Sequence, residues 1–356
     1  MRASTYLSRS SKTDKVDWSS EDGWTVVPLG LLGEIGSLCE AIKKHRRDYK
    51  TNQILKEHVR EEVGDILWYL CAAARRLGIK RLEWPEAGRK SSHLIMQNLQ
   101  KIVDNASLIY QERTAIRDED SSKKDAIKRQ INEILLGLQG IAKSTGQDLA
   151  SISDHAIKKN EEYWGQPSSS SPCFDLEYPP YERLPRKFCI HFREVKAGKD
   201  SQLIISINGI QLGDRLTDNT HQETGYRYHD VFHMSAAAFL GWSPVFRRML
   251  KRKRKSASKV DENEDGARAA IIEEAVVSQV YRYGIQTKFR PQKSIDEDLI
   301  KLIMEMTTEY ECKELEGRDW KKYATTSIEI FGRIKDGFTG KINFDADSRN
   351  YEIIPD

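Results

Sequence analysis

The feature that most constrains the fold is an internal repeat of helical pattern in the first half of the chain. The apolar positions of two segment pairs largely coincide at offsets of 64 and 68 residues. Each copy then reaches a glycine, Gly78 or Gly146, where a helix would end. The repeat predicts two helix pairs in tandem, because such helices must bury their apolar faces against one another. The matching segments are Leu31–Glu40 with Ile95–Asp104, and Val63–Leu70 with Ile131–Leu138.

A stretch rich in proline and serine separates this helical half from a half with a different pattern. The runs Gln166–Pro172 and Tyr178–Tyr181 cannot continue a helix and are typical of a linker. The sequence therefore predicts an all-α N-terminal helical bundle followed by an α+β C-terminal domain. In the second half, alternation predicts strands within 188–210, helical patterns occupy about 221–241, 266–284, 296–310 and 318–336, and 341–354 predicts a closing strand pair.

This division predicts four segments, and the length of 356 residues agrees with two domains. The segments are an N-terminal extension at 1–23, a helical domain at 24–165 with its second repeat at 93–164, a linker at 166–187, and an α+β domain at 188–356.

Composition narrows the classes of function. Lysine and arginine total 57 against 54 aspartate and glutamate, a net charge of +3 that is too balanced for a surface binding nucleic acid all over. The sequence has no apolar run of 18 residues and no apolar signal region in its first 20 residues, so we expect neither a membrane span nor secretion. Its five scattered cysteines, without a CxxC pair, predict reduced thiols and a cytoplasmic protein.

Acidic residues stand beside the apolar stripes of the first helix pair. Glu62 and Asp65 are three residues apart, so both carboxylates lie on one helix face, and Glu34 lies on the preceding predicted helix. Carboxylates grouped beside a core repel one another unless a cation lies among them, and oxygen ligands suit Mg²⁺ or Mn²⁺. The common alternative is a solvated face with ordinary salt bridges, for which Arg60 and Arg75 are available.

These segments resemble a known family. Leu31–Lys44 and Glu61–Ile79 look like the two motif helices of the MazG-like all-α nucleoside triphosphate pyrophosphohydrolases, whose pattern is Glu-x-x-Glu followed by Glu-x-x-Asp. Asp148–Trp164 resembles the last helix of that family, in which a lysine helps to bind phosphate. The resemblance covers roughly residues 24–164.

The resemblance implies metal-dependent hydrolysis between the α and β phosphates of a nucleoside triphosphate, which gives a monophosphate and pyrophosphate. It implies Mg²⁺ (or Mn²⁺) as the cofactor and a homo-oligomer, with a dimer favoured. Divalent-ion chemistry agrees with a polyphosphate substrate. The implied roles are metal binding by Glu34, Glu62 and Asp65, catalysis by Glu61 and Glu62 with Glu61 accepting the proton of water, and phosphate binding by Lys43, Lys44 and Lys159.

One position departs from the family pattern. Ser37 stands where the family has its second glutamate, which removes one negative charge from the metal site and puts activity in doubt. Glu40 is about 60° away around the helix, so we do not expect it to replace that glutamate directly. The second repeat departs further, and we expect it to be a structural partner in which Lys101 contacts phosphate. It aligns Glu34 with Asn98, Ser37 with Lys101, Glu62 with Gln130, and Asp65 with Glu133.

The C-terminal half contains a separate cluster. His229 and His233 are four residues apart on a predicted helix, with Asp230 adjacent, and such a set binds a transition metal when another ligand joins it. Glu273 and Glu274 on the next long helix are candidate donors. The alternative is a structural pair of histidines that hydrogen-bond within a packed helix interface.

A basic run follows at 247–259, with eight basic residues, and an acidic run at 261–265 comes directly after it. The common interpretation is a solvated loop in which the opposite charges meet, and the alternative is contact with phosphate or nucleic acid. The run itself contains no aromatic residue that would stack on bases. Residues from about 226 to 285 also resemble a domain attached to MazG-like proteins as a C-terminal extension.

The leading hypothesis is a cytoplasmic, Mg²⁺-dependent nucleotide pyrophosphohydrolase with an appended α+β domain, and without a membrane partner. Control of nucleotide pools and phage defence are two settings that the resemblance suggests. One alternative is a regulatory protein with a weakened site that still binds a nucleotide. The other is nucleic-acid binding or nuclease action through His229, Asp230, His233 and the run at 247–259.

Overall fold

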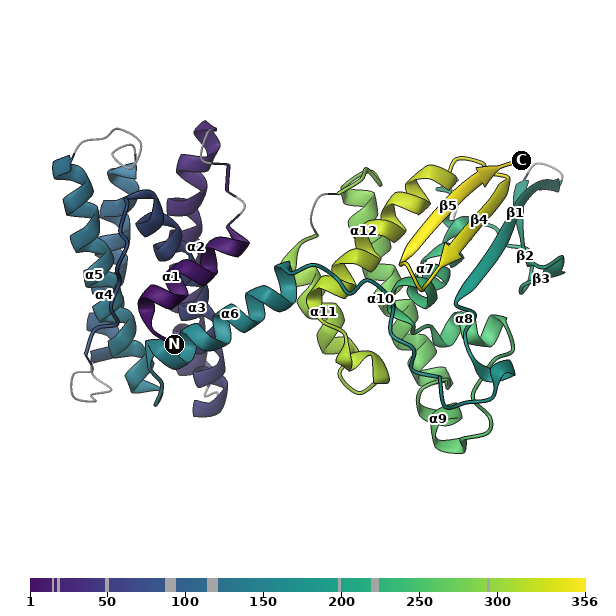
Figure 1. Cartoon of the computed structure of the whole chain (residues 1–356), viewed down its shortest axis with the longest axis horizontal. Coiled ribbons are helices and arrows are strands. Elements are labelled where there is room, and N and C mark those ends of the chain that lie inside the picture. Colours follow the sequence, from purple (N-terminus) through teal and green to yellow (C-terminus); the bar gives the residue numbers. More distant parts are fainter. Residues whose placement is uncertain are drawn as a thin grey trace. The chain divides into compact units, whose positions relative to one another are not determined.

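The computed structural model describes residues 1–14, 16–17, 20–48, 51–86, 94–113, 121–197, 200–218, 224–292 and 295–356. The chain separates into two compact units, Met1–Gly165 and Gln166–Asp356 (Figure 1). The described part of the first unit is helical, and the second combines helices with one antiparallel sheet. The predicted fold class is therefore confirmed.

Two helix hairpins form the body of the first unit. In the first, α2 (Glu21–Arg47) packs along α3 (Asn52–Arg76), and in the second, α4 (Leu94–Gln111) packs along α5 (Ser121–Ser144). Contacts of α2 with α4 and of α3 with α5 join the hairpins into one bundle. A sixth helix, α6 (Leu149–Trp164), packs on α3 and α5. The tandem helix pairs that the repeat predicts are thus the architecture of this unit.

The two hairpins also end in the same way. Gly78 follows α3 with φ of 74°, and Gly146 follows α5 with φ of 75°, a left-handed conformation that glycine adopts without a steric penalty. After α3, the N–H of Ile79 donates to the carbonyl of Ala74 at 3.0 Å, and after α5 the N–H of Gln147 donates to Ala142 at 2.9 Å. These bonds satisfy carbonyls left over at each helix end, so both glycines terminate their helices as predicted.

The first residues of the chain belong to the core of this bundle. Helix α1 (Ala3–Ser10) and the 3-10 turn η1 (Ser11–Thr13) place Tyr6 and Leu7 among the buried residues. The hydroxyl of Tyr6 donates to the carbonyl of Gly64 at 3.3 Å, and Arg75 pairs with Asp14 at 2.7 Å. The segment predicted as an N-terminal extension therefore contains a helix that packs as part of the helical unit.

One described helical segment, Thr25–Arg47, is long and apolar enough to cross a membrane by length and composition. Its apolar side chains Leu31, Ile35 and Leu38 are buried in the bundle core. Packing against α3 therefore accounts for the apolar residues on one side of this segment, whereas Val26 and Leu29 are exposed.

The second unit is built on a five-stranded antiparallel sheet. Its strands are β1 (Lys187–Ala197), β2 (Asp200–Ile207), β3 (Ile210–Gln211), β4 (Gly340–Asp345) and β5 (Asn350–Pro355), in the order β3-β2-β1-β4-β5 (Figure 1). Alternate residues of β1, Phe188, Ile190 and Phe192, are buried, as the period of a strand requires. The closing strand pair β4–β5 is the one predicted at 341–354.

Helix α7 (Asp230–Leu240) is the central helix of this unit, since every residue from Val231 to Leu240 is buried. It contacts β4 on one side and lies along α12 (Gly317–Ile334). The predicted helix at 221–241 begins at Asp230 in the described chain, after the turn η4 (Tyr226–Tyr228), and residues 219–223 lie outside the described residues. The other helices and turns are α8 (Pro244–Met249), α9 (Ser258–Asn263), α10 (Ala267–Gln286), α11 (Glu297–Met306), η3 (Pro180–Glu182) and η5 (Glu311–Glu314).

Most of the segment predicted as a linker, 166–187, packs on this second unit. The N–H of Ser171 donates to the carbonyl of Ala346 at 3.0 Å, and Asp175 is buried. The Asp175 carboxylate accepts from the N–H of Leu184 at 2.7 Å and from the guanidinium of Arg247 at 2.6 Å. Burial alone raises the pKa of Asp175, but these donors outweigh it and hold that pKa below its usual value. The proline and serine residues prevent a continuous helix, but the segment packs on the second unit and is not a free linker.

Candidate functional site

The first hairpin carries a pocket of about 500 Å³ between α2 and α3. From α2 it is lined by Ser37, Glu40 and Lys44, and from α3 by His58 and Glu62. Residues three and four apart share one helix face, so both helices present polar side chains to the same space. The remaining lining residues are Gly33, Gly36 and Ala41.

Two glycines keep this pocket open. A Cβ built on Gly33 or on Gly36 would meet nothing within 4 Å, so the space beside each is empty of protein atoms. Glycine costs helix stability relative to alanine. Two such residues on one helix face, both beside charged side chains, make a hollow wide enough for a polar ligand.

The charges of α2 are paired with one another at the pocket. Glu40 forms an ion pair with Lys43 and another with Lys44, the latter at 3.4 Å. The hydrogen bond from Lys43 is the main cause that holds the pKa of Glu40 below its usual value. Of the two lysines predicted to bind phosphate on this helix, Lys44 lines the pocket, and Lys43 is an exposed partner of Glu40.

A second charged group lies where α6 meets α3. The ammonium of Lys159 donates to both carboxylate oxygens of Asp65, at 2.8 and 2.7 Å, and lies 3.8 Å from Glu61. Close packing places it there, because a Cβ on Gly64 would come within 2.9 Å of the Cβ of Ala156, one turn before Lys159. The sequence predicts Lys159 as a phosphate ligand, and here it neutralises the Asp65 carboxylate.

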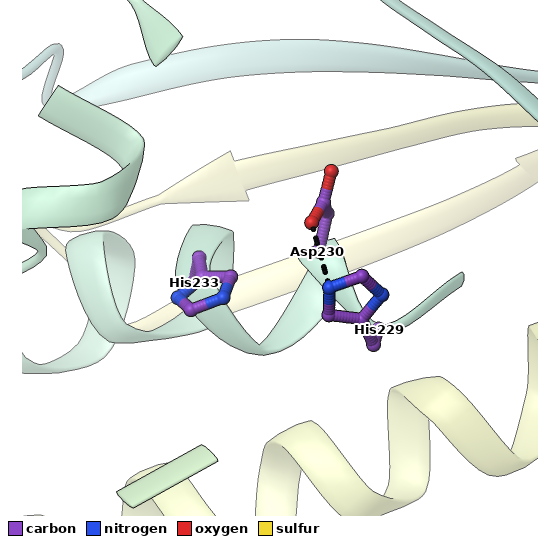
Figure 2. Close-up of side chains that lie close together, drawn as sticks. All are labelled: His229, Asp230 and His233. Carbon is purple, nitrogen blue, oxygen red and sulfur yellow. Dashed lines mark ion pairs between the residues drawn. The ribbon is translucent and has the colours of Figure 1, made fainter. Parts of the chain in front are cut away.

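A third cluster lies in the C-terminal unit at the start of α7, where Figure 2 shows His229, Asp230 and His233. One ligand atom from each of the three lies within 4.8 Å of the others. Nε2 of His229 is 3.3 Å from Oδ1 of Asp230, and the ring of Tyr226 stacks on that of His229 with centroids 4.4 Å apart. The cluster predicted from the sequence is therefore assembled in the fold.

Helix α10 adds two glutamates to this cluster. Nδ1 of His233 is 2.8 Å from Oε1 of Glu273, which also accepts from the hydroxyl of Ser243 at 2.6 Å. Glu274 lies on the other side of the imidazole, with its Oε1 3.4 Å from Nε2 of His233. Burial alone lowers the pKa of His233, but the carboxylates of Glu273 and Glu274 outweigh it and raise that pKa to about 10.

Comparison with known proteins assigns the chain to a family. The profile of the MazG C-terminal domain matches residues 169–356, which is more than half of the chain. The chain belongs to the MazG C-terminal domain family. It is thus a MazG-like protein, and the matched range includes most of the segment that the structure packs on the second unit.

A curated relative matches a much shorter stretch of this MazG-like chain. The Gene 37 protein of Mycobacterium phage L5 is 35% identical over 66 residues, which are 18% of this chain and 57% of that protein. The chain therefore covers a little over half the length of that relative. No solved structure matches the chain significantly.

The donors of the MazG-like helical unit fit a hard divalent ion. The carboxylates of Glu61, Glu62 and Asp65 lie within two turns of α3, the α2 side adds the Ser37 hydroxyl, and His58 adds an imidazole nitrogen, so most of the donors are oxygen atoms. Lys159 already balances Asp65, so an ion would have to share that carboxylate with the lysine or displace it. Glu34, half-buried on α2 one turn before Ser37, is not among the described residues that line the pocket, and neither is Asp65.

The second MazG-like hairpin uses the equivalent positions differently. Lys101 on α4 forms an ion pair with Glu133 on α5, so the residues aligned with Ser37 and Asp65 neutralise each other. A Cβ on Gly140 would lie 2.3 Å from the side chain of Asn98, the residue aligned with Glu34. Lys101, predicted to contact phosphate, is therefore held within its own hairpin.

Three of the eight basic residues in the run at 247–259 form ion pairs. Arg247 and Arg254 are buried, and Arg254 pairs with Asp265 at 2.7 Å and with Glu311 at 2.7 Å. Lys253 pairs with Asp261 at 2.6 Å, so the basic and acidic runs meet. The exposed members are Arg248, Lys251, Lys255 and Lys259. Contact with nucleic acid stays a prediction, now confined to these exposed side chains.

Two residues of the MazG-like pocket were not predicted from the sequence. His58 lies four residues before Glu62 on α3, so the same helix-face spacing would have placed it beside that glutamate. Glu40 lies three residues after Ser37, and an offset of about 60° still leaves it on the face that borders the pocket. Whether Glu40 replaces the missing glutamate directly stays untested, since here it is paired with Lys43 and Lys44.

Proposed function

We propose that this MazG-like protein hydrolyses nucleoside triphosphates, or their deoxy forms, to a monophosphate and pyrophosphate with Mg²⁺ or Mn²⁺. The observation that carries the proposal is the pocket between α2 and α3, in which Glu62, Glu40, Lys44 and Ser37 surround a space opened by two glycines. Both signs of charge at one hollow suit a polyphosphate that arrives with a divalent ion. The family supports a nucleotide pyrophosphohydrolase as the class of activity.

The side chains divide the chemistry between them. Glu61 accepts the proton of the attacking water, whose oxygen forms a bond to the α-phosphorus while the bond to the bridging oxygen breaks and pyrophosphate leaves. Glu62 and Asp65, with Glu34 from α2, hold the divalent ion. When bound, that ion neutralises phosphate charge and polarises the phosphorus centre. Lys44 at the pocket and Lys159 beside Asp65 supply the positive charge that the phosphates need.

Ser37 sets the strength of this activity. A hydroxyl contributes a neutral oxygen where the family pattern has a carboxylate, and fewer charged ligands weaken a site for a hard cation. The alternative is a protein that binds a nucleotide without turnover and passes that state to its C-terminal domain. The two functions differ in one measurable quantity, which is the release of pyrophosphate.

The test is a panel of NTPs and dNTPs incubated with the full chain and Mg²⁺, Mn²⁺ or a chelator, with both products identified. We expect monophosphate and pyrophosphate in equal amounts, and we expect no reaction with the chelator. Glu62→Gln should reduce the rate by about 100-fold or more, since it removes one ligand charge. The control is Glu57→Gln, the same change at an exposed position of α3.

Three results would decide against hydrolysis between the α and β phosphates at this pocket. They are the absence of pyrophosphate with every nucleotide, a diphosphate as the product, or equal rates for Glu62→Gln and Glu57→Gln. Absence of turnover combined with binding of a fluorescent nucleotide analogue, weakened by Glu62→Gln, would establish the regulatory alternative.

A further inference from the structure

We propose that the C-terminal domain binds one transition-metal ion, with Zn²⁺ as the best fit, between the start of α7 and the middle of α10. The ligands are His229, Asp230, His233 and Glu274. This site lies in a different unit from the proposed pyrophosphohydrolase pocket and does not depend on its activity.

Both histidines are already oriented as metal ligands. Nδ1 of His229 lies 2.9 Å from the carbonyl of Tyr226, and Nδ1 of His233 lies 2.8 Å from the carboxylate of Glu273. A carbonyl or carboxylate oxygen holds the imidazole proton on Nδ1. At His229 this leaves the lone pair on Nε2, and at His233, where Nε2 lies beside the Glu274 carboxylate, the metal ion takes the place of the proton on that nitrogen. The two Nε2 atoms are then the ones that face Asp230 and Glu274.

The Glu273 carboxylate, which contacts Nδ1 of His233, is itself fixed by further hydrogen bonds. Glu273 is buried and also accepts hydrogen bonds from the hydroxyl of Ser243 at 2.6 Å and from the N–H of Val245 at 2.8 Å. A carboxylate with three donors cannot rotate without losing bonds. Glu273 therefore acts as a positioning residue that fixes the ring of His233.

Two of the ligand separations match the edges of a tetrahedron. With metal–ligand bonds of about 2.0 to 2.1 Å, the ligand atoms of a tetrahedral zinc site lie about 3.3 to 3.4 Å apart. Here Nε2 of His229 is 3.3 Å from Asp230, and Nε2 of His233 is 3.4 Å from Glu274. One ligand atom each from His229, Asp230 and His233 lies within 4.8 Å of the others, and Glu274, which is outside that group, has to move toward it when the ion binds. His229 and Asp230 are partly exposed, with side-chain exposed fractions of 16% and 13%, which leaves them room to adjust.

Nε2 of His233 is a buried polar atom that needs a partner. The residue is fully buried, and within the described chain this nitrogen has no hydrogen bond of acceptable geometry. The Glu274 carboxylate is at ion-pair distance only. Such an atom is satisfied either by a proton shared with Glu274 or by a metal ion, and the nearby ligand atoms of His229 and Asp230, within 4.8 Å, favour the ion.

Charge and ligand type select the ion. Two neutral imidazoles and two carboxylates carry a charge of about −2, which a divalent ion cancels. Mixed nitrogen and oxygen donors suit Zn²⁺ and its first-row neighbours, whereas Mg²⁺ prefers oxygen alone. Glu274 is half-exposed and provides the route by which an ion exchanges with solvent.

The test uses Co²⁺ as a spectroscopic probe on the full chain, stripped of metal and held in excess Mg²⁺. We expect one Co²⁺ per chain with the visible absorption of a tetrahedral complex, and we expect one equivalent of Zn²⁺ to abolish it. His229→Gln and Asp230→Asn should weaken Co²⁺ binding by about 100-fold, and Glu273→Gln by about 10-fold to 100-fold. His191→Gln is the matched control, since that histidine pairs with Asp356 on the sheet.

The outcomes separate this site from the N-terminal pocket. Glu62→Gln should keep the full Co²⁺ absorption, whether or not it hydrolyses nucleotides. Zn²⁺ should raise the melting temperature of the parent and of His191→Gln, but not of His229→Gln. The proposal is overturned if the parent binds no more Co²⁺ than the His229→Gln, Asp230→Asn double variant, or if the absorption is octahedral. Because both changed residues are partly exposed, the test does not depend on a variant of buried His233.

Discussion

The two helix hairpins of the N-terminal unit share one backbone plan and differ in what their facing surfaces hold. In the first hairpin, Gly33 and Gly36 face open space, and charged residues border the hollow. In the second, the space beside Gly140 is filled by Asn98, and Lys101 pairs with Glu133. The repeat conserves the supporting helices, while a small number of side chains decides whether the surface between them is a pocket or a packed interface.

The largest expected difference concerns the aligned acids Asp65 and Glu133. Asp65→Asn removes a carboxylate from the proposed metal ligands, and this carboxylate is the nearer of the two beside Lys159. We expect a fall in kcat/KM for pyrophosphate release of about 100-fold or more. Glu133→Gln should leave the rate within about twofold, because it breaks only an exposed ion pair. Equal losses in the two variants would mean that the hairpins contribute alike.

The next comparison restores the missing carboxylate. Ser37→Glu adds a charged oxygen ligand at the pocket, and we expect the Mg²⁺ concentration for half-maximal activity to fall about tenfold. Lys101→Glu is the aligned change in the second hairpin and should not alter the Mg²⁺ requirement, although it places two glutamates together. A titration of initial rate against Mg²⁺ measures both. An unchanged requirement in Ser37→Glu would remove Ser37 from the site.

Two glycines of the first hairpin should respond in opposite ways to alanine. In Gly64→Ala the new methyl would meet Ala156 at 2.9 Å, and we expect a loss of about 1 to 3 kcal/mol in the free energy of unfolding. Gly36→Ala meets nothing and should gain about 0.5 to 1 kcal/mol, yet it puts a methyl at the pocket and should slow hydrolysis. Urea denaturation and the pyrophosphate assay test the pair. A Gly36→Ala variant that is both more stable and fully active would place the substrate elsewhere.

The smallest expected effect concerns α6, which brings Lys159 to the first hairpin. Asp148 caps this helix by accepting from the N–H of Ser151 at 2.8 Å, and that bond holds the pKa of Asp148 below its usual value. Asp148→Ala should cost about 1 kcal/mol at neutral pH. Because the folded pKa is lowered, the cap stabilises the fold above about pH 4, and its contribution is lost as the pH falls through the folded pKa. A gap between parent and variant that persisted at pH 2 would contradict this account.

Local pattern in the sequence was enough to predict the hairpins and several of their details. Apolar spacing located α2 to α6, the two glycines at helix ends were identified as such, and the alternation at 188–210 and 341–354 located the strands. These features depend on neighbours in the chain, which the sequence displays directly. The same local logic placed His229, Asp230 and His233 on one turn of helix.

Features that depend on distant contacts were not predicted. Nothing in the order of residues shows that Lys159 meets Asp65, since 94 positions separate them and only the packing of α6 on α3 joins them. The burial of Arg247 and Arg254 within a run that resembles a solvated loop has the same origin, because their acidic partners Asp175 and Glu311 lie far along the chain. Helix α1 was predicted to lie outside the helical domain for a similar reason. Its few apolar residues span only about two turns, which is too short to show a helical period.

The docking of Asp175 on Arg247 determines where the C-terminal domain can be cut. A fragment begun at β1 would omit Asp175 and leave a fully enclosed guanidinium with less opposing charge, a defect that costs about 3 to 5 kcal/mol. A fragment that starts before Ser171 retains the Asp175–Arg247 ion pair and the Ser171 hydrogen bond. We expect it to be the shortest fragment in which the domain can be studied in isolation.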